Sequence, residues 1–361
     1  MGDDKLLPAP WFRIREVRHI WRKQYIFRKN LTLRKLANLT RLTAAYIAGR
    51  ADFGGVPFHI KVDVAPQCQL RCPVCLHGAM DRADEKSLPP PMEFGVFKQL
   101  VDQVAGRTHV MSLYNLGEPL VNRALPAMIA YAAKANINTY ITSNFSFRMT
   151  DQRLTELACS GLTMLIVAVD GISNATYGAQ RVRGRWDLIE ANLRRFIEIR
   201  PKNGPRLVLQ YIVFDHNRHE VPDVEAFARS AGIDDLLVFE GTTTPWLTEF
   251  APRAGWQPRE KAKLPRCAWP FFSALIGPEG NVYGCCHYRM DENYLAQDKT
   301  RPLGNVAAAS LETIYASELY RTARRMANDP VATGRQDTHF CDGCPKLQSG
   351  AALPVRESIR R

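Results

Sequence analysis

The sequence predicts an α/β protein in which a parallel sheet curls into part of a barrel, followed by a small C-terminal domain and preceded by a helical extension. Three observations predict it. Strand-like and helix-like segments alternate over residues 58–245, the alternation stops near residue 245, and the cysteines gather in groups. Alternating strands and helices are typical of parallel sheets. In barrels of this kind the chemistry lies at the C-terminal ends of the strands.

The predicted core is a partial barrel of six β/α units. Phe58, Ile60, Val62 and Val64 alternate with less apolar residues as a half-buried strand does. The other expected strands cover 109–114, 138–142, 163–169, 206–214 and 235–239, and the expected helices cover 92–105, 123–134, 151–160, 186–200 and 219–231. We therefore expect three parts, namely an extension over 1–57, a core over 58–245 and a C-terminal domain over 246–361.

The N-terminal extension is basic and helical in pattern. Apolar residues recur at helical spacing over 11–28, and a second helix is expected over about 31–48. One side of this second helix holds Leu33, Leu36, Ala37, Ala44 and Ile47. A basic helical segment suits either peripheral contact with an anionic membrane surface or a solvated layer packed over the barrel. The sequence leaves both interpretations open.

Composition narrows the functional class. The 361 residues carry a net charge of +12 and include nine cysteines. No apolar run of about 20 residues is present, as a membrane-spanning helix requires, and a cytoplasmic location is expected. Clustered cysteines in a reducing compartment indicate metal binding rather than disulfides. Cys159 stands apart in a helical apolar stretch, and we expect a buried, inert thiol there.

The first cysteine group directly follows the first expected strand. Cys68, Cys72 and Cys75 have the spacing C-x3-C-x2-C. Three thiolates on a four-iron cubane leave one iron without a protein ligand, where a small molecule can chelate. Zinc is the alternative, with His77 as the candidate fourth ligand, but structural zinc sites usually pair C-x2-C units.

This motif, at the end of the first strand of a six-unit α/β chain, resembles that of the radical S-adenosylmethionine (SAM) superfamily. The resemblance implies that the open iron of a [4Fe–4S] cluster binds the amino and carboxylate groups of SAM. It also implies that an electron from the reduced cluster breaks a C–S bond of SAM. The resulting 5′-deoxyadenosyl radical removes hydrogen from a substrate, and reduced flavodoxin or ferredoxin is the expected electron donor.

The resemblance extends to candidate SAM contacts after the second and third strands. Gly117, Glu118 and Pro119 are similar to the family's G-E-P element, which implies that Glu118 meets the SAM ammonium group. Ser143 and Asn144 match a T-N-G-like SAM-contacting loop in part, because serine and asparagine replace the usual asparagine and glycine.

Further candidates follow the fourth and fifth strands. Asp170 resembles the aspartate of an S-x-D-G element, although Ala168 replaces its serine. Arg181 matches an arginine that pairs with the SAM carboxylate in relatives, with Arg183 as the alternative. Gln210, inside the fifth strand, is a weaker candidate to face SAM. Downstream, Asn217-x-x-Glu220 fits a helix N-cap with a capping-box glutamate, and we expect a structural role for both residues.

The second cysteine group resembles a SPASM or shorter twitch domain, which holds auxiliary clusters. Cys267, Cys285, Cys341 and Cys344 are implied to enclose one auxiliary [4Fe–4S] cluster, and Cys286 is the spare thiol or exchanges roles with Cys285. Zinc is the rival here too, since four thiolates also form a tetrahedral zinc site. A hairpin that turns at Gly280 is expected to carry Cys285.

The expected reaction is hydrogen abstraction from a small-molecule, carbohydrate-like substrate. Dehydrogenation follows if the auxiliary cluster accepts an electron, and epimerisation follows if Cys286 returns a hydrogen atom. A maturase that modifies a ribosomal peptide or protein is the alternative. A zinc-stapled nucleic-acid-binding protein is the alternative of another class, but no aromatic-rich basic strand is present for base stacking, and no nucleic-acid partner is expected.

Overall fold

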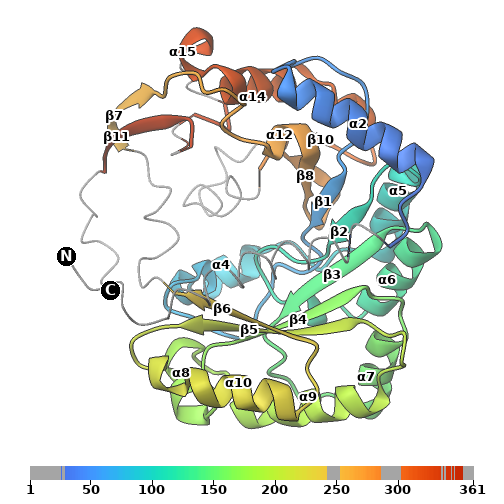
Figure 1. The fold of residues 1–361 in the computed structure, drawn as a ribbon, viewed down its shortest axis with the longest axis vertical. Coiled ribbons are helices and arrows are strands. Elements are labelled where there is room, and N and C mark those ends of the chain that lie inside the picture. Colours follow the sequence, from blue (N-terminus) through green and yellow to red (C-terminus); the bar gives the residue numbers. More distant parts are fainter. Residues whose placement is uncertain are drawn as a thin grey trace.

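The computed structural model describes residues 26, 29–241, 253–285, 302–334, 336, 339–342, 344 and 346–352. Most of the helix expected over 11–28 lies outside these residues. Figure 1 shows an open, curved sheet with helices along its outer side. A smaller C-terminal part, coloured orange to red, lies at one end of the arc.

The main sheet has nine strands within the described residues, in the order β10-β9-β8-β1-β2-β3-β4-β5-β6. The predicted core strands are β1 (His59–Val62), β2 (Val110–Ser112), β3 (Asn138–Ser143), β4 (Met164–Val169), β5 (Arg206–Val213) and β6 (Asp235–Glu240). Neighbours from β1 to β6 pair in parallel. The expected partial barrel of six parallel strands is therefore confirmed, and its sheet does not close.

Helices cover the outer side of this sheet (Figure 1). The five predicted ones are α5 (Phe94–Val104), α6 (Leu125–Lys134), α7 (Asp151–Ala158), α9 (Trp186–Ile199) and α10 (Val221–Ser230). The structure adds short helices that the sequence pattern did not predict: α3 (Leu76–Ala79), α4 (Arg82–Ser87), η1 (Pro119–Val121), α8 (Asn174–Gln180) and η2 (Arg218–Glu220). Segments this short carry too little periodicity to be detected.

Side chains of β1 alternate between two environments. Ile60 and Val62 are fully buried in the hydrophobic core under the helices. His59 and Lys61 point to the opposite, inner face of the sheet and are half-buried. The inner face therefore offers polar groups, whereas the outer face is apolar.

The predicted hairpin at Gly280 is confirmed, and it extends the core sheet. β8 (Ser273–Ile276) pairs antiparallel with β9 (Asn281–Tyr283), and Gly280 takes a φ of +82° in the turn. β8 also pairs in parallel with β1. Residues on both sides of the expected boundary at 245 thus share one sheet, and the domain boundaries stay a prediction.

The C-terminal part has further elements besides this hairpin. They are β7 (Arg253–Pro258), α12 (Trp269–Phe272), β10 (Gly304–Asn305), α13 (Leu311–Tyr315), α14 (Glu318–Asn328), α15 (Pro330–Thr333) and β11 (Gln348–Ala352). β7 and β11 form a separate two-stranded antiparallel sheet. α13 begins at the Ser310 N-cap and buries Leu311 and Ile314.

The helix expected over 31–48 is present as α2 (Leu33–Ile47), but its apolar side is not the buried one. Leu33 is 86% exposed and Ile47 is 63% exposed. The buried face instead holds Lys35, Asn38, Leu42 and Ala45. Hydrophobic periodicity does not indicate which side of this helix is buried, because polar side chains can be buried when they find hydrogen-bond partners.

Those partners are backbone carbonyl groups. The Nζ atom of Lys35 donates to the Asn30 carbonyl at 2.9 Å and to the Asn136 carbonyl at 2.5 Å. Asn38 donates through Nδ2 to the Val56 carbonyl at 2.9 Å. α2 is thereby fixed to the turn that precedes β3 and to the segment before β1.

The C-terminal end of α2 packs on the C-terminal part of the chain. The Tyr46 hydroxyl donates to the Pro265 carbonyl at 3.0 Å. Its ring meets the rings of Phe271 and Phe272 edge-on, with centroids 5.3 Å and 5.5 Å apart. For this helix, the interpretation as a packing layer is therefore supported.

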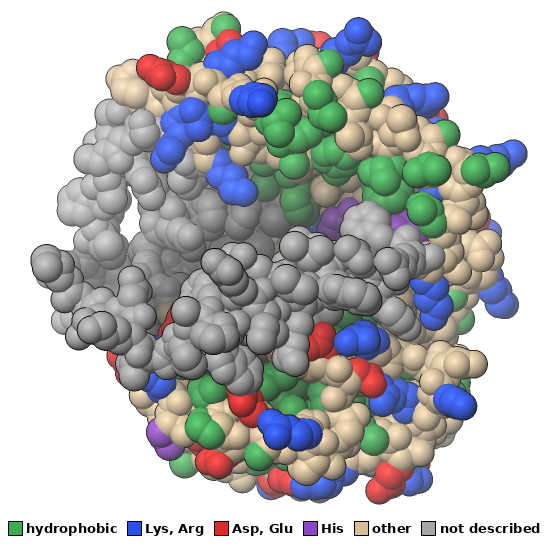
Figure 2. All heavy atoms as spheres, viewed as in Figure 1, with side chains coloured by type: hydrophobic (Ala, Val, Ile, Leu, Met, Phe, Trp, Pro, Cys, Tyr) green, Lys and Arg blue, Asp and Glu red, His purple; other side chains and the backbone are tan. Residues whose placement is uncertain are grey.

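Lys and Arg side chains are distributed around the visible face of the molecule rather than gathered in one patch (Figure 2). Within the described part of the chain, no helix combines the length and the apolar character that crossing a bilayer requires.

The expectation that Cys159 is a buried thiol is wrong. It follows the last turn of α7 and is exposed, because the apolar residues of that stretch face the other way.

Candidate functional site

The three cysteines of the C-x3-C-x2-C motif lie in the loop that joins β1 to α3, at the C-terminal edge of the parallel strands. The Cys75 amide donates to the Cys72 carbonyl at 3.0 Å, which closes a turn. Burial raises the pKa of Cys68 to about 12, and the nearby Glu118, Cys72 and Cys75 raise it further, while a backbone amide at Leu70 opposes them. The three thiols are therefore within electrostatic reach of one another.

Gly117 presses against the backbone of this cysteine loop. A Cβ atom on Gly117 would lie 2.2 Å from the Ala65 carbonyl oxygen and 2.5 Å from the Gln67 carbonyl oxygen, both closer than real Cβ contacts allow. The next amide, of Glu118, donates to the Gln67 carbonyl at 2.8 Å. The G-E-P element thus supports the backbone of the loop that carries the thiols.

The Glu118 carboxylate is buried below the loop. It accepts hydrogen bonds from the Leu120 amide at 3.0 Å, the Ser143 hydroxyl at 2.8 Å and the Asn144 amide at 2.8 Å. Burial raises the pKa of Glu118 to about 7, although these hydrogen bonds and the charge of Arg181 lower it. A cation placed beside this carboxylate would favour its charged form.

Ser143 and Asn144 lie at the end of β3 as expected, where they hold Glu118. Asn144 also accepts a hydrogen bond from Gln69 Nε2 at 2.8 Å through its Oδ1 atom. Its Nδ2 atom lies 3.9 Å from the Cys68 sulfur. These two residues therefore connect the predicted carboxylate to the predicted thiol ligand.

The buried Asp170 and the half-buried Arg181 form an ion pair beside the second cysteine. The Arg181 Nε and Asp170 Oδ2 atoms are 2.5 Å apart, and a second contact of 3.3 Å joins Nη2 to Oδ1. Burial raises the pKa of Cys72 to about 11, whereas the charge of Arg181 and a hydrogen bond from it lower that pKa. Arg183, the alternative arginine, is exposed, so the structure brings Arg181 to the site.

Asn217 and Glu220 do not form the expected capping box. Asn217 Nδ2 donates to the Asp170 carbonyl at 2.8 Å, and the Glu220 carboxylate accepts from the Ile172 amide at 3.0 Å and from the Tyr211 hydroxyl at 3.0 Å. The capping pattern fits the spacing, but the tertiary fold directs both side chains to the end of β4. Together they fix the loop that presents Asp170.

Tyr177 belongs to this site and was not predicted. Its ring is fully buried in α8, and its hydroxyl donates to the Asn144 carbonyl at 3.4 Å. Burial raises its pKa well above the ordinary value, and its electrostatic neighbours include Arg181 and Cys72. The capping box of Ser173, which starts α8, is the sequence signal that could have identified this helix.

His77 lies behind the third cysteine. Its Nδ1 atom is 3.7 Å from the Cys75 sulfur, and its Nε2 atom is 2.6 Å from the Pro66 carbonyl oxygen. Burial alone would raise the pKa of Cys75, but the hydrogen bond and charge of His77 outweigh it, and the net shift is downward. Within the described residues, no three His, Cys, Asp or Glu side chains gather as they would around a single metal ion.

A polar and aromatic surface lies on the inner face of the sheet. The Lys61 ammonium is 4.9 Å from the centroid of the Tyr114 ring. His59 stacks on Tyr140 with centroids 6.3 Å apart, and burial, assisted by the charge of Lys61, lowers the pKa of His59 to about 4. Gln210 lies two strands further along, in register with Ala168 on β4.

The auxiliary cysteines gather in the C-terminal part. Burial raises the pKa of Cys341 well above the ordinary value, and Cys344 and Cys267 raise it further. These three also pack against one apolar cluster. Cys285 follows β9. Burial raises the pKa of Tyr320, and both Cys285 and Cys341 raise it further. Cys286 lies outside the described residues.

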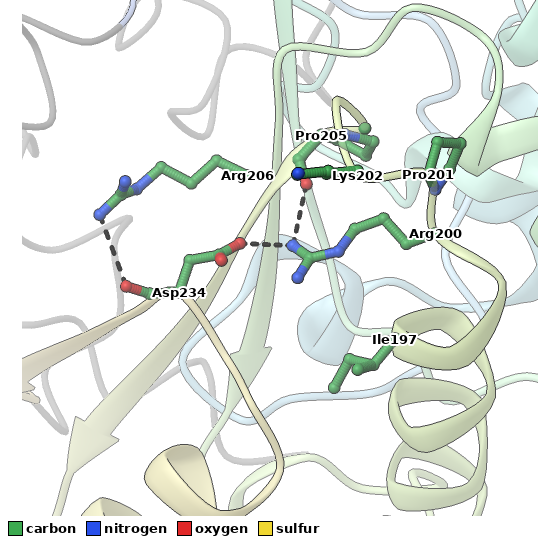
Figure 3. Close-up of a pocket in the computed structure, with 8 residues that line it drawn as sticks. Ile197, Arg200, Pro201, Lys202, Pro205, Arg206 and Asp234 are labelled. Carbon is green, nitrogen blue, oxygen red and sulfur yellow. Dashed lines mark hydrogen bonds and ion pairs between the residues drawn. The ribbon is translucent and has the colours of Figure 1, made fainter.

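The hollow drawn in Figure 3 is not part of this site. It measures about 240 Å³ and is lined by Arg200, Arg206 and Asp234. Arg206 begins β5, so the hollow lies at the N-terminal end of the strands, opposite to the cysteine loop. An ion pair between Arg200 and Asp234 forms part of its wall.

A family model described as "Iron-sulfur cluster-binding domain", SPASM, matches residues 267–345. The PqqA peptide cyclase of Xanthomonas campestris pv. campestris is 24% identical over 183 residues, which is 50% of this chain and 46% of that protein. The chain thus matches slightly less than half the length of this relative.

Two solved structures resemble the fold. Streptococcus suis SuiB bound to its precursor peptide SuiA gives a TM-score of 0.58 at 12% identity, covering 82% of this chain and 74% of SuiB. Native anSMEcpe with bound AdoMet gives 0.53 at 13% identity, covering 81% and 88%. Together with the family match, these results confirm the predicted fold class and agree with [4Fe–4S] clusters and SAM as cofactors.

Replacing Gly117 by alanine should disturb the cysteine loop, because the new methyl group would meet the Ala65 and Gln67 carbonyl oxygens. Overpacking of this kind costs about 1–3 kcal/mol. We expect a lower thermal midpoint and less iron bound after anaerobic reconstitution, measured by unfolding and by metal analysis.

Gly95→Ala is the matched control, since a Cβ atom there meets nothing within 4 Å and Gly95 lies in α5. Alanine in a helix is favoured over glycine by about 1 kcal/mol. Equal iron content in both variants would contradict the supporting role of Gly117.

Proposed function

We propose that this chain is a member of the radical SAM superfamily with a C-terminal SPASM domain. From that premise, we propose that it is an enzyme which abstracts hydrogen from a small-molecule, carbohydrate-like substrate. The observation that carries the proposal is the meeting of three groups at one edge of the sheet. These are the thiols of the cysteine loop, the buried Glu118 carboxylate and the Arg181–Asp170 pair.

The residues present fit the cofactors. Cys68, Cys72 and Cys75 would hold the cluster, and Glu118 and Arg181 offer one negative and one positive group beside it, which match an ammonium and a carboxylate. When bound, a reduced [4Fe–4S] cluster and SAM supply the 5′-deoxyadenosyl radical. Asp170 orients Arg181 and leaves part of its guanidinium fork free for a second acceptor.

The inner face of the sheet is the proposed substrate surface. Lys61 supplies a positive charge, His59 is neutral at pH 7, and Tyr114 and Tyr140 supply aromatic faces. Among the described residues, Lys61 has no carboxylate partner within ion-pairing distance. A polyhydroxylated substrate with an anionic group, such as a sugar phosphate, complements this combination.

Modification of a ribosomal peptide or protein is the second candidate. It is favoured by the names of the relatives, a peptide cyclase and a structure that contains a precursor peptide.

The division of the chain into 1–57, 58–245 and 246–361 remains part of the proposal, as does reduction by flavodoxin or ferredoxin.

The first test is SAM cleavage by the anaerobically reconstituted and reduced protein, followed through 5′-deoxyadenosine. Removing a hydrogen bond to a charged group costs about 1.5–3 kcal/mol, so Arg181→Gln should weaken SAM binding at least tenfold. Arg183→Gln, at an exposed arginine two residues away, should not. A colourless zinc protein without iron, or equal effects of both variants, would contradict the proposed site.

The same assay discriminates between the substrate classes. Sugar phosphates should stimulate 5′-deoxyadenosine formation, and Lys61→Met should reduce that stimulation while uncoupled SAM cleavage persists. Stimulation by a peptide alone would favour the maturase function instead.

Cys286 is the proposed hydrogen donor if the reaction is an epimerisation. In deuterated water, Cys286→Ala should abolish solvent deuterium at the epimerised carbon, measured by mass spectrometry of the product. Cys159→Ala, at an exposed thiol directly after α7, is the control. Unchanged deuterium incorporation in Cys286→Ala would exclude this role and assign the return of hydrogen to another donor.

Peripheral contact with an anionic membrane is proposed for the exposed face of α2, on which Leu33, Leu36 and Ile47 are flanked by Arg34 and Arg41. The protein should co-sediment with vesicles that contain phosphatidylglycerol and not with pure phosphatidylcholine. The double variant Leu33→Asp/Ile47→Asp should lose this binding. Val331→Asp, which changes an exposed apolar residue of α15, should keep it, and identical behaviour of the two variants would refute the contact.

A further inference from the structure

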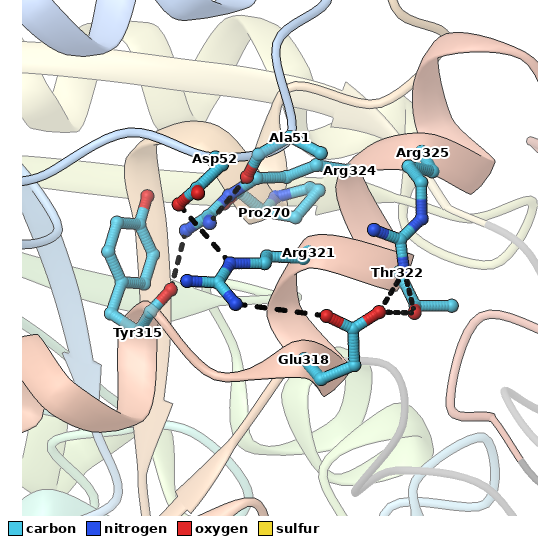
Figure 4. A network of polar contacts seen from close by, with 9 residues as sticks. All are labelled: Ala51, Asp52, Pro270, Tyr315, Glu318, Arg321, Thr322, Arg324 and Arg325. Carbon is cyan, nitrogen blue, oxygen red and sulfur yellow. Dashed lines mark hydrogen bonds and ion pairs between the residues drawn. The ribbon is translucent and has the colours of Figure 1, made fainter.

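Arg324 is a fully buried cation in the C-terminal part of the chain (Figure 4). Its Nε atom donates to the Pro270 carbonyl at 3.0 Å, Nη1 to the Ala51 carbonyl at 3.1 Å, and Nη2 to the Tyr315 carbonyl at 2.8 Å. These acceptors come from three segments that are far apart in the sequence. The guanidinium therefore joins the segment after α2 to the C-terminal helices.

Aromatic rings enclose the same guanidinium. Its central carbon lies 4.2 Å from the ring centroid of Phe53, 4.3 Å from that of Tyr315 and 5.5 Å from that of Tyr320. Ring faces and carbonyl oxygens are partially negative, and they offset part of the cost of burying a cation. Neither carries a full negative charge.

The neighbouring arginines of α14 differ from Arg324 in this respect. Arg321 pairs with Asp52, and Arg325 pairs with Glu318, both at the surface. Among the described residues, Arg324 pairs with no carboxylate, and burial lowers its pKa. An uncompensated buried charge is costly, so a negative group of another kind is expected nearby.

The segments that carry the auxiliary cysteines contact rings that Arg324 also contacts. The Tyr320 ring, whose centroid is 5.5 Å from the Arg324 guanidinium carbon, meets the ring of Phe340, next to Cys341, with centroids 6.4 Å apart. The Tyr320 hydroxyl donates to the carbonyl of Tyr283, two residues before Cys285, at 3.5 Å. Phe53, which Arg324 also contacts, packs against the same apolar cluster as Cys267, Cys341 and Cys344. Two aromatic residues thus connect the cation to the cysteine segments.

We propose that Arg324 is the counter-charge of the auxiliary cluster and raises its reduction potential. The inference rests on the proposed function, because it requires an iron–sulfur cluster at Cys267, Cys285, Cys341 and Cys344. A cubane held by four thiolates is net negative and becomes more negative on reduction, and its potential depends on nearby charge. A buried cation acts strongly because the protein interior screens charge less than water does.

A raised potential makes the auxiliary cluster a better electron acceptor. Arg324 therefore favours a reaction that ends in electron transfer from the substrate radical, and so dehydrogenation over epimerisation. In this account Arg324 is a positioning residue that acts through the electrostatic field at the cluster and does not touch the substrate.

The test isolates the auxiliary cluster in the full-length chain with Cys68, Cys72 and Cys75 replaced by alanine. After anaerobic reconstitution, iron and sulfide are counted, and the midpoint potential is measured by a redox titration followed by electron paramagnetic resonance. Arg324→Gln should shift the potential to a more negative value, and Arg324→Lys, which keeps the charge, should shift it less.

Arg325→Gln is the matched control, because it removes the same charge from the same helix at an exposed position. It should leave the potential unchanged. If Arg324→Gln does not fold, Arg324→Met, whose apolar chain fits between the rings, supports the same comparison. An intact cluster with an unshifted potential in the neutral variants, or an equal shift in Arg325→Gln, overturns the inference. A parent chain that binds no iron and sulfide would instead remove the auxiliary cluster from the proposed function.

Discussion

The contact between Gly117 and the cysteine loop is the constraint on which the rest of the site depends. Two carbonyl oxygens of the loop approach the Gly117 Cα so closely that no side chain fits between them. Because of this approach, the Glu118 amide reaches the Gln67 carbonyl, and the buried Glu118 carboxylate lies close enough to Cys68 to raise its pKa. A loop fixed by the neighbouring strand can present three thiols in one arrangement, which a freely moving loop could not.

Each further polar residue of the site is fixed by the strand next to it. Ser143 at the end of β3 holds Glu118, and Asn217 after β5 holds the carbonyl of Asp170 after β4. Asp170 in turn holds Arg181 against Cys72. This chain of contacts follows the curvature of the sheet, because the C-terminal ends of parallel strands meet at one edge.

The C-terminal part is integrated with the core rather than appended to it. β8 continues the parallel sheet beside β1. Arg324, which pairs with no carboxylate among the described residues, binds carbonyl groups from both the N-terminal and the C-terminal segments. α2 contributes Tyr46 to the same region. The part of the chain that carries the auxiliary cysteines is therefore coupled to the strand that carries the first cysteine loop.

The sequence by itself determined the six strands, the cysteine spacings and the G-E-P element, because these depend on local periodicity and on fixed chain intervals. Only the tertiary structure decided which polar side chains are buried. Lys35 and Asn38, rather than the apolar side of α2, are buried, and Glu220 leaves its expected capping role. Tyr177 and Arg324 enter buried sites that hydrophobic periodicity did not predict. The physical reason is that a polar group is buried where partners from distant segments satisfy it, and a linear pattern does not reveal those partners.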